Sequence, residues 1–186
     1  MKPSPASISR SSLPVRALLR FRQGVRALAA WFQPVDDARA ARYLSPALFA
    51  LYSRMRRSER QHSLRALADM LAQGHDHPDL LAAALLHDVG KTRVPFWLPE
   101  KVLVVLVKAF APQCYARWGS GGAQGWRRPF AVSVQHPAWG AELVAEAGAP
   151  ALVIDLVGRH ADPPLDAPQN EADRLLALLQ AVDDRN

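Results

Sequence analysis

Cysteine is nearly absent from this sequence: Cys114 is the single cysteine among 186 residues. One cysteine cannot form an intramolecular disulfide, and it cannot build the cysteine-rich zinc sites that stabilise many small domains. The composition therefore favours a reducing, cytoplasmic setting. Any metal ion in such a protein would be held mainly by His, Asp or Glu side chains.

Acidic residues are missing from the N-terminal segment, in which Asp36 is the first of them. The same segment holds six basic residues, and the remaining 17 basic residues balance the 17 acidic ones, so the arm accounts for the net charge of +6. Apolar residues recur there at helical spacing between Leu13 and Phe32. We therefore predict a basic arm with an amphipathic helix at residues 1–34, followed by a domain at residues 35–186.

Three kinds of partner suit such an arm. The commonest is the domain itself or a second copy of the chain, which would make a homodimer. The alternative is peripheral contact of residues 13–32 with an anionic membrane surface, and nucleic acid is the least favoured. Long apolar runs are also lacking: the run Val102–Val107, bounded by lysines, is far too short to span a bilayer.

Strict two-residue alternation, which is typical of strands, does not occur, and neither does an internal repeat. Caps and prolines instead delimit helices, so we predict an all-α fold. The glycine-rich stretch Gly119–Arg128 is expected to be a loop. The predicted helices are Asp36–Tyr43, Pro46–Met55, Ser58–Gln73, Asp79–Val89, Leu98–Phe110, His136–Ala147 with Pro137 in its first turn, Ala149–His160 and Glu171–Asp184.

Potential metal ligands lie at or near the ends of these apolar helices. In LLHDVGK, His87 and Asp88 follow a run that should be buried, where an uncompensated carboxylate would be costly. A bound cation would remove that cost, and Fe or Mn accepts a mixture of imidazole and carboxylate ligands. Other helices carry further candidates: His62, His136, His160 and Asp183.

A histidine, an adjacent His-Asp pair and a distant aspartate, in this order, resemble the HD superfamily of metal-dependent phosphohydrolases. AALLHDVGK is close to the central signature of that superfamily. QHSLRALADML looks like its first-histidine helix, and LLALLQAVDD looks like its last-aspartate helix. The resemblance runs from Ser58 to Asp184 and implies an HD-domain-like helical bundle, to which the basic N-terminal helix would be an addition.

The resemblance also implies a set of metal ligands. Two divalent ions would share Asp88, with three further ligands on one side and two on the other: His62, His87 and Asp183, then His136 and His160. The sequence does not distinguish Fe, Mn, Mg, Co and Ni. Asp184 is a rival to Asp183, which we prefer because it follows the inward-facing Leu179 by four residues.

The implied activity is hydrolysis of a phosphoester or phosphoanhydride in a small nucleotide-like substrate by a metal-activated hydroxide. Asp88 and Lys91 are the candidate catalytic residues. Lys91 would share the face of His87 if the helix continues through Gly90, and it would then contact a substrate phosphate. The other candidate substrate contacts are Arg127, Arg128 and Arg159.

The substrate itself stays open. The superfamily includes hydrolases of nucleotides, of dinucleoside polyphosphates and of cyclic dinucleotides. The members that act on cyclic di-GMP carry a His-His pair and a Gly-Tyr-Pro signature, whereas here Ala161 follows His160 and no such signature occurs. The members that act on cyclic di-AMP have a similar DVGK-like and His-Pro pattern, so a cyclic dinucleotide phosphodiesterase of that kind remains an alternative. A regulatory module that binds metal or nucleotide without turnover is another.

Overall fold

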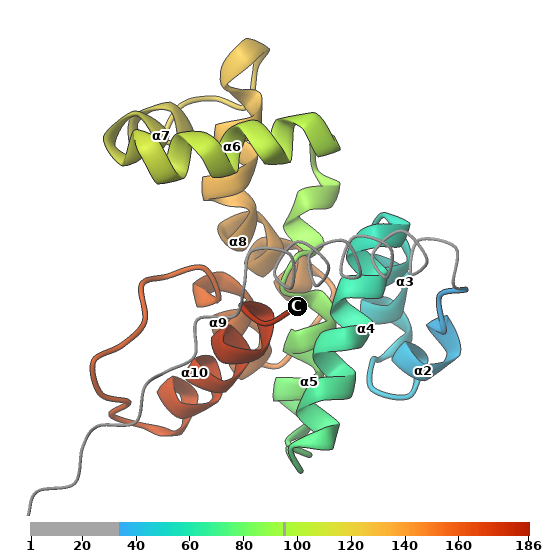
Figure 1. Ribbon diagram of the computed structural model, residues 1–186. Coiled ribbons are helices and arrows are strands. Elements are labelled where there is room, and N and C mark those ends of the chain that lie inside the picture. Colours follow the sequence, from blue (N-terminus) through green and yellow to red (C-terminus); the bar gives the residue numbers. More distant parts are fainter. Residues whose placement is uncertain (1–33, 95) are drawn as a thin grey trace, which may run out of the picture. The chain divides into compact units, whose positions relative to one another are not determined.

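The computed structural model describes residues 34–94 and 96–186, and from Val35 to Asn186 they belong to one compact unit (Figure 1). The predicted all-α class is confirmed, since the described residues form α-helices and short 3₁₀ helices but no strand. No helix in these ranges combines the length and the apolar character needed to cross a membrane. The helix predicted within residues 13–32 lies outside the described residues.

Helices and turns follow one another with short connections, apart from the loop before the last helix. In chain order, the elements are α2 (Asp37–Ala41), α3 (Pro46–Ser53), α4 (Arg57–Ala72), α5 (Pro78–Leu86), the 3₁₀ helix η1 (Val89–Thr92), α6 (Leu98–Phe110), α7 (Pro112–Gly119), the 3₁₀ helix η2 (Gly125–Arg127), α8 (Arg128–Glu146), α9 (Ala151–Arg159) and α10 (Glu171–Asp183).

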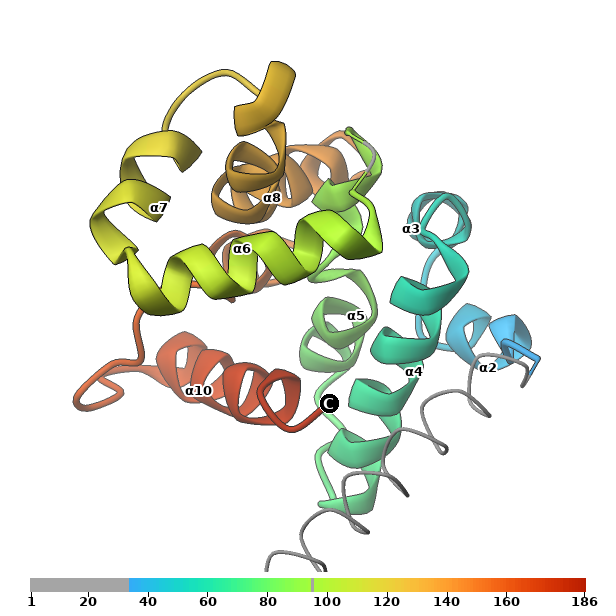
Figure 2. The same ribbon diagram turned by 45° about the horizontal axis from the view of Figure 1, so that its top comes forward.

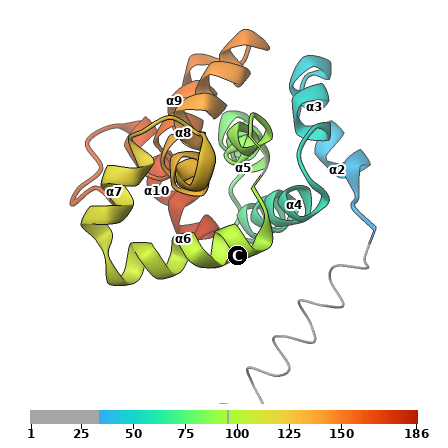
Figure 3. The same ribbon diagram turned by 90° about the horizontal axis from the view of Figure 1, so that it is seen from above.

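Helix α5 is buried on all sides. Ala82 is the most exposed residue from Leu80 to Leu86, and it is only 6% exposed. An Ala/Leu-rich helix without a polar face is stable when other helices surround it, and α4, α9 and α10 all contact α5. Figure 3 shows α5 between α4 on one side and α8 and α9 on the other. The C-terminal end of α5 therefore delivers His87 and Asp88 into the interior.

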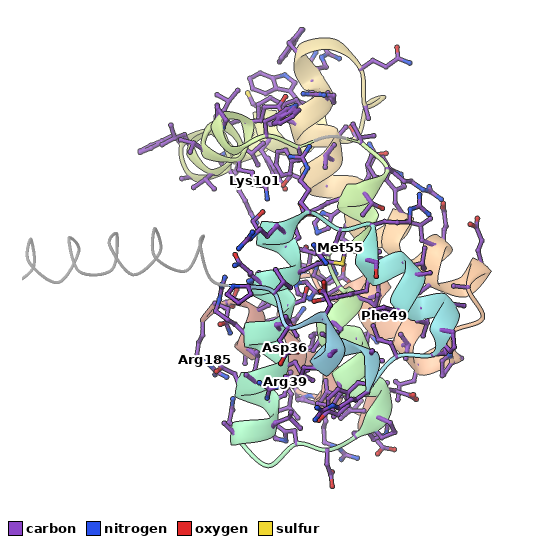
Figure 4. The ribbon with its side chains drawn as sticks, turned by 90° about the vertical axis from the view of Figure 1, so that its right-hand side faces the viewer. Asp36, Arg39, Phe49, Met55, Lys101 and Arg185 are labelled. Carbon is purple, nitrogen blue, oxygen red and sulfur yellow. The ribbon has the colours of Figure 1, made fainter. Side chains whose placement is uncertain are left out.

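A second, smaller apolar cluster joins α6 and α7 to the first half of α8, and Figure 2 shows α6 and α7 beside α8. Phe130 is buried at its centre, and the ring of Trp118 meets it edge-on with 5.1 Å between centroids. Arg56, just before α4, connects this cluster to α4 by donating a hydrogen bond to the carbonyl oxygen of Phe96 at 2.6 Å. Lys101 also reaches from α6 toward α4, where its Nζ lies 3.6 Å from Oε1 of Glu59 (Figure 4).

Three details of the chain differ from the predictions. The predicted helix start at His136 is wrong, because α8 begins at Arg128 and contains Pro137 in its interior. The short helix α7, which begins with Pro112, was not predicted. Helix α5 ends at Leu86 instead of at the predicted Val89, and the chain turns into η1.

Candidate metal centre

Six side chains from five separate parts of the chain converge on one region in two groups of three. Each member offers one ligand atom, and within a group these atoms all lie within 4.8 Å of one another. The contributing positions lie on α4, on the turn after α5, on α8, directly after α9 and at the end of α10. The first group contains His62, His87 and Asp183, and the second contains Asp88, His136 and His160.

In the first group, the aspartate joins the two histidines. Oδ1 of Asp183 lies 2.7 Å from Nε2 of His62 and 3.4 Å from Nε2 of His87. The two Nε2 atoms are themselves 3.2 Å apart. Asp184 is exposed and caps the end of α10. The geometry therefore brings Asp183, and not its neighbour, to the histidines.

In the second group, Asp88 faces two histidines and also adjoins the first group. Its Oδ1 lies 3.4 Å from Nε2 of His136 and 3.9 Å from Nε2 of His160. The same oxygen is 3.8 Å from Nε2 of His87. Asp88 is thus the side chain that connects the two groups.

Backbone carbonyls orient three of the four imidazole rings. Nδ1 of His87 lies 3.0 Å from the carbonyl oxygen of Ala84, and Nδ1 of His160 lies 2.8 Å from that of Val157. Nδ1 of His136 is similarly close to carbonyl oxygens of its own helix. A carbonyl only accepts, so Nδ1 carries the proton and Nε2 keeps its lone pair for a cation.

Pro137 explains how His136 obtains its orientation. Proline has no N–H, so Pro137 leaves the carbonyl of Ser133, four residues earlier, without its helical donor. Nδ1 of His136 lies 3.0 Å from that oxygen and donates to it in place of the missing N–H. A proline in this position therefore helps to aim the imidazole that precedes it. The His-Pro dipeptide is the sequence signal that could have predicted this orientation of His136.

The donor set suits a divalent cation. Nε2 of His136 and Nε2 of His160 face each other at 3.1 Å although both Nδ1 atoms are already donors. Two lone pairs at this separation repel each other unless a proton or a cation lies near both. Imidazole nitrogens combined with carboxylate oxygens are ligands that Fe, Mn, Co, Ni and Zn accept.

Positive groups keep both carboxylates ionised. Burial alone would raise the pKa of Asp88, but Lys91 and then His87 outweigh it and hold that pKa well below its usual range. Burial also opposes ionisation of Asp183, yet hydrogen bonds with His62 and His87 lower the pKa of its carboxyl. Ionised carboxylates are the form that binds a metal.

The buried histidines divide into two kinds. Burial lowers the pKa of His87, but the neighbouring carboxylates of Asp88 and Asp183 outweigh burial and raise it above its ordinary value. For His160, burial acts together with the nearby His87 and His136, and the pKa falls to about 3. His160 is therefore neutral and ready to bind a cation throughout the physiological range.

Lys91 lies against Asp88, a member of the second group. The short 3₁₀ turn places residues three apart above one another, and Nζ of Lys91 lies 2.5 Å from Oδ1 of Asp88. The condition given for this position, a helix that continues through Gly90, is not met, but the side chain of Lys91 still reaches Asp88. The ammonium of Lys91 is the nearest positive charge to the carboxylate of Asp88 and contributes most to keeping it ionised.

The three arginines predicted to bind substrate have other partners. Arg128 forms an ion pair with Glu100 of α6, and Arg127 stacks over Trp126 at 5.1 Å. Arg159 is held by two carboxylates, Asp155 at 3.0 Å and Asp173 at 2.8 Å. Within the described residues, Lys91 is thus the one of the four predicted substrate contacts that touches a member of the two groups.

Two glycines allow η1 to lie directly on α8. A Cβ atom on Gly90 would come within 1.9 Å of the carbonyl oxygen of His136 and 2.6 Å of the amide nitrogen of Gly140. Only glycine permits so close an approach between two backbones. This contact holds Asp88, two residues before Gly90, beside His136. No sequence pattern predicted it.

A comparison with protein-family models agrees with this geometry. The model described as HD domain matches residues 60–184, which is well over half of the chain and includes all six side chains. The chain belongs to the HD domain family. HD domains are generally metal-dependent hydrolases, so the family accounts for the convergence of histidines and aspartates. A search of curated proteins and a search of solved structures each found no match.

Acid should destabilise the HD domain when it is free of metal. Between pH 6.5 and about 3, an unfolded His160 binds a proton that the folded residue does not bind. Stability should therefore fall on acidification, by about 1.4 kcal/mol per pH unit and by about 3 kcal/mol at pH 4.5. Urea unfolding of chelator-treated protein at several pH values measures this slope.

The variant His160→Asn is the control for that experiment. It removes the group whose pKa is lowered, so its stability should depend much less on pH in this window. The carboxylates of the two groups titrate at lower pH and contribute little above pH 4.5. Equal pH dependence in the variant and the natural chain would contradict the assignment to His160.

Proposed function

We propose that this HD domain is a phosphohydrolase that uses two divalent metal ions to cleave a phosphoester or phosphoanhydride of a small nucleotide-like substrate. The observation that carries the proposal is the position of Asp88, whose Oδ1 lies within 3.9 Å of three histidine Nε2 atoms from both groups. A single bridging carboxylate between two clusters of ligands is an arrangement suited to a pair of ions.

Each of the two groups would supply the ligands of one ion. His62, His87 and Asp183 would hold one ion, His136 and His160 would hold the other, and Asp88 would bridge them. When bound, divalent ions lower the pKa of water and neutralise charge on phosphate oxygens. The protein contributes by keeping both aspartates ionised and by fixing three of the imidazoles with backbone carbonyls.

Lys91 is the candidate contact for the substrate phosphate. Its side chain is 17% exposed, so the ammonium lies at the border between the buried carboxylate and solvent. If a cation takes over the neutralisation of Asp88, the ammonium becomes available for an incoming anion. Arg127, Arg128 and Arg159 are weaker proposals, because each already has a partner.

Replacing Lys91 with Met should lower kcat/KM for a phosphate substrate by about 10- to 100-fold, which is the range expected for losing one charge-assisted hydrogen bond. Metal content should be retained, because the lysine competes with a cation for Asp88. Lys91→Arg should keep most of the activity, and Lys108→Met serves as a matched control on α6. Loss of metal in Lys91→Met would contradict this role.

The proposed function is tested by metal analysis and hydrolysis assays on one preparation. Untagged protein, purified anaerobically without chelator, should carry about two transition-metal ions per chain. It should release phosphate or a nucleoside monophosphate from at least one member of a panel of nitrophenyl phosphates, nucleotides and cyclic dinucleotides. A chain that takes up no metal on titration would overturn the proposal. A loaded chain without turnover on the panel would support the regulatory alternative instead.

A further inference from the structure

Helix α6 presents apolar side chains to solvent along most of its length. Phe110 is 83% exposed, Val105 is 65% exposed and Val102 is 54% exposed. We define the α6 face as the five large apolar side chains exposed on this helix: Val102, Leu103, Val105, Leu106 and Phe110. Isolated exposed apolar residues are ordinary, but a contiguous set on one helix indicates a binding surface.

The α6 face covers a broad arc of the helix. At 100° per residue, its members fall within roughly 160° of the circumference. Val104 is buried on the opposite side, where it joins the apolar cluster beneath the helix. Lys101 and Lys108, which are seven residues apart, lie along the same margin of the arc. Helix α6 therefore has a narrow inward face, a wide apolar outward face and a basic edge.

Charge around the face is predominantly positive. From Trp97 to Arg128 the chain holds five basic residues and one acidic residue, Glu100. Glu100 is paired with Arg128, and Lys101 lies near Glu59 of α4, so the exposed Lys108, Arg117 and Arg127 carry the remaining positive charge. The side chain of Lys108 lies over the ring of Tyr115 and is exposed. A complementary surface must therefore be both apolar and anionic.

Exposed tryptophans accompany the basic residues. Trp97, at the start of α6, is 57% exposed and lies under the guanidinium of Arg56 at 4.5 Å. Trp126 is 62% exposed and lies under that of Arg127 at 5.1 Å. Tryptophan and arginine side chains both have an apolar body and a polar edge, which suits the boundary between lipid headgroups and acyl chains.

We propose that the α6 face docks on the surface of an anionic lipid bilayer. Apolar side chains would enter the boundary between headgroups and acyl chains, while the exposed Lys108 would lie among anionic headgroups. The proposal does not depend on the proposed hydrolase activity. It assigns membrane contact to the described helix α6, independently of the basic arm at residues 13–32.

A second copy of the chain fits this face less well. A symmetric contact between antiparallel α6 helices would bring the lysines of one copy close to those of the other. The five exposed apolar side chains of one 13-residue helix also fall short of the approximately 800 Å² per partner of a stable interface. The arm of this chain is equally unsuitable by charge, because it is basic and lacks acidic residues before Asp36.

Vesicle flotation with the full chain tests the proposal. Binding should be at least 10-fold stronger to phosphatidylcholine vesicles containing about a third phosphatidylglycerol than to pure phosphatidylcholine, and it should weaken as NaCl rises from about 0.05 to about 0.5 M. The variant Val105→Glu should lower the partition coefficient for anionic vesicles at least 10-fold. Val105→Leu should preserve it.

The matched control is Leu165→Glu, which makes the same charge change at an exposed apolar residue, 42% exposed, in the loop before α10. It should leave vesicle binding within twofold of the natural chain. Circular dichroism should show that all three variants are folded.

Three outcomes would overturn the proposal. The first is a natural chain that does not bind anionic vesicles. The second is an equal loss of binding in Val105→Glu and Leu165→Glu, or no loss in either, which would transfer any binding to another part of the chain. The third is self-association, measured by sedimentation, that Val105→Glu abolishes while vesicle binding persists, because the α6 face would then be an interface between copies.

Discussion

Replacing Asp88 with Asn is expected to reduce hydrolysis on the order of 1,000-fold or more and to lower metal affinity by at least about 100-fold. The amide keeps the size of the carboxyl group but loses its charge and one acceptor oxygen. Among the residues that the structure describes, Asp88 is the side chain between the two groups, since its Oδ1 is within 3.9 Å of Nε2 of His87, His136 and His160. The substitution should therefore weaken the binding of both ions together.

The measurement is metal content per chain, determined beside activity on the best substrate of the panel. Asp183→Asn should separate the two groups, because it removes a ligand only from the side of His62 and His87. That variant should retain about one ion. Asp184→Asn is the matched control, since it alters the exposed neighbouring carboxylate and should change metal content and activity less than twofold. An Asp88→Asn chain with two ions and full activity would exclude the bridging role.

Replacing Gly90 with Ala is expected to destabilise the protein by about 3 kcal/mol or more. The added Cβ would come within 1.9 Å of the carbonyl oxygen of His136 and 2.9 Å of its carbonyl carbon. Backbone atoms inside a helix cannot rotate out of the way as a side chain can, so η1 and α8 must separate. That movement would carry Asp88 away from His136, and we expect weaker metal binding as a second effect.

Thermal unfolding should show the loss of stability as a decrease in Tm of about 6–12 °C. Gly122→Ala is the control, because an added Cβ there meets no atom within 4 Å. It should change the free energy of unfolding by less than about 0.5 kcal/mol. Comparable Tm values for the two variants would show that the close contact between η1 and α8 does not carry this energy.

The sequence alone determined the helical class and the types of side chain available to a metal. Helix α6 begins and ends where the sequence predicted, at Leu98 and Phe110, because a proline in its first turn and a second proline after its end act locally. The single cysteine left His, Asp and Glu as the available ligands. The order of the six candidate residues along the chain then identified the family, because family membership is recorded in sequence spacing.

Tertiary structure decided what the polar residues do. Asp183 and Asp184 are adjacent in the sequence, and only the docking of α10 beside α4 brings one of them to His62. Pro137 resembles a helix start, yet burial within α8 and a donor from His136 allow the helix to continue through it. Gly90 resembles a helix end, whereas its function is to let two backbones meet. The exposure of the α6 face was likewise decided by tertiary structure. Helix caps and ligand types depend on neighbours in sequence, whereas proximity and exposure depend on how distant helices pack.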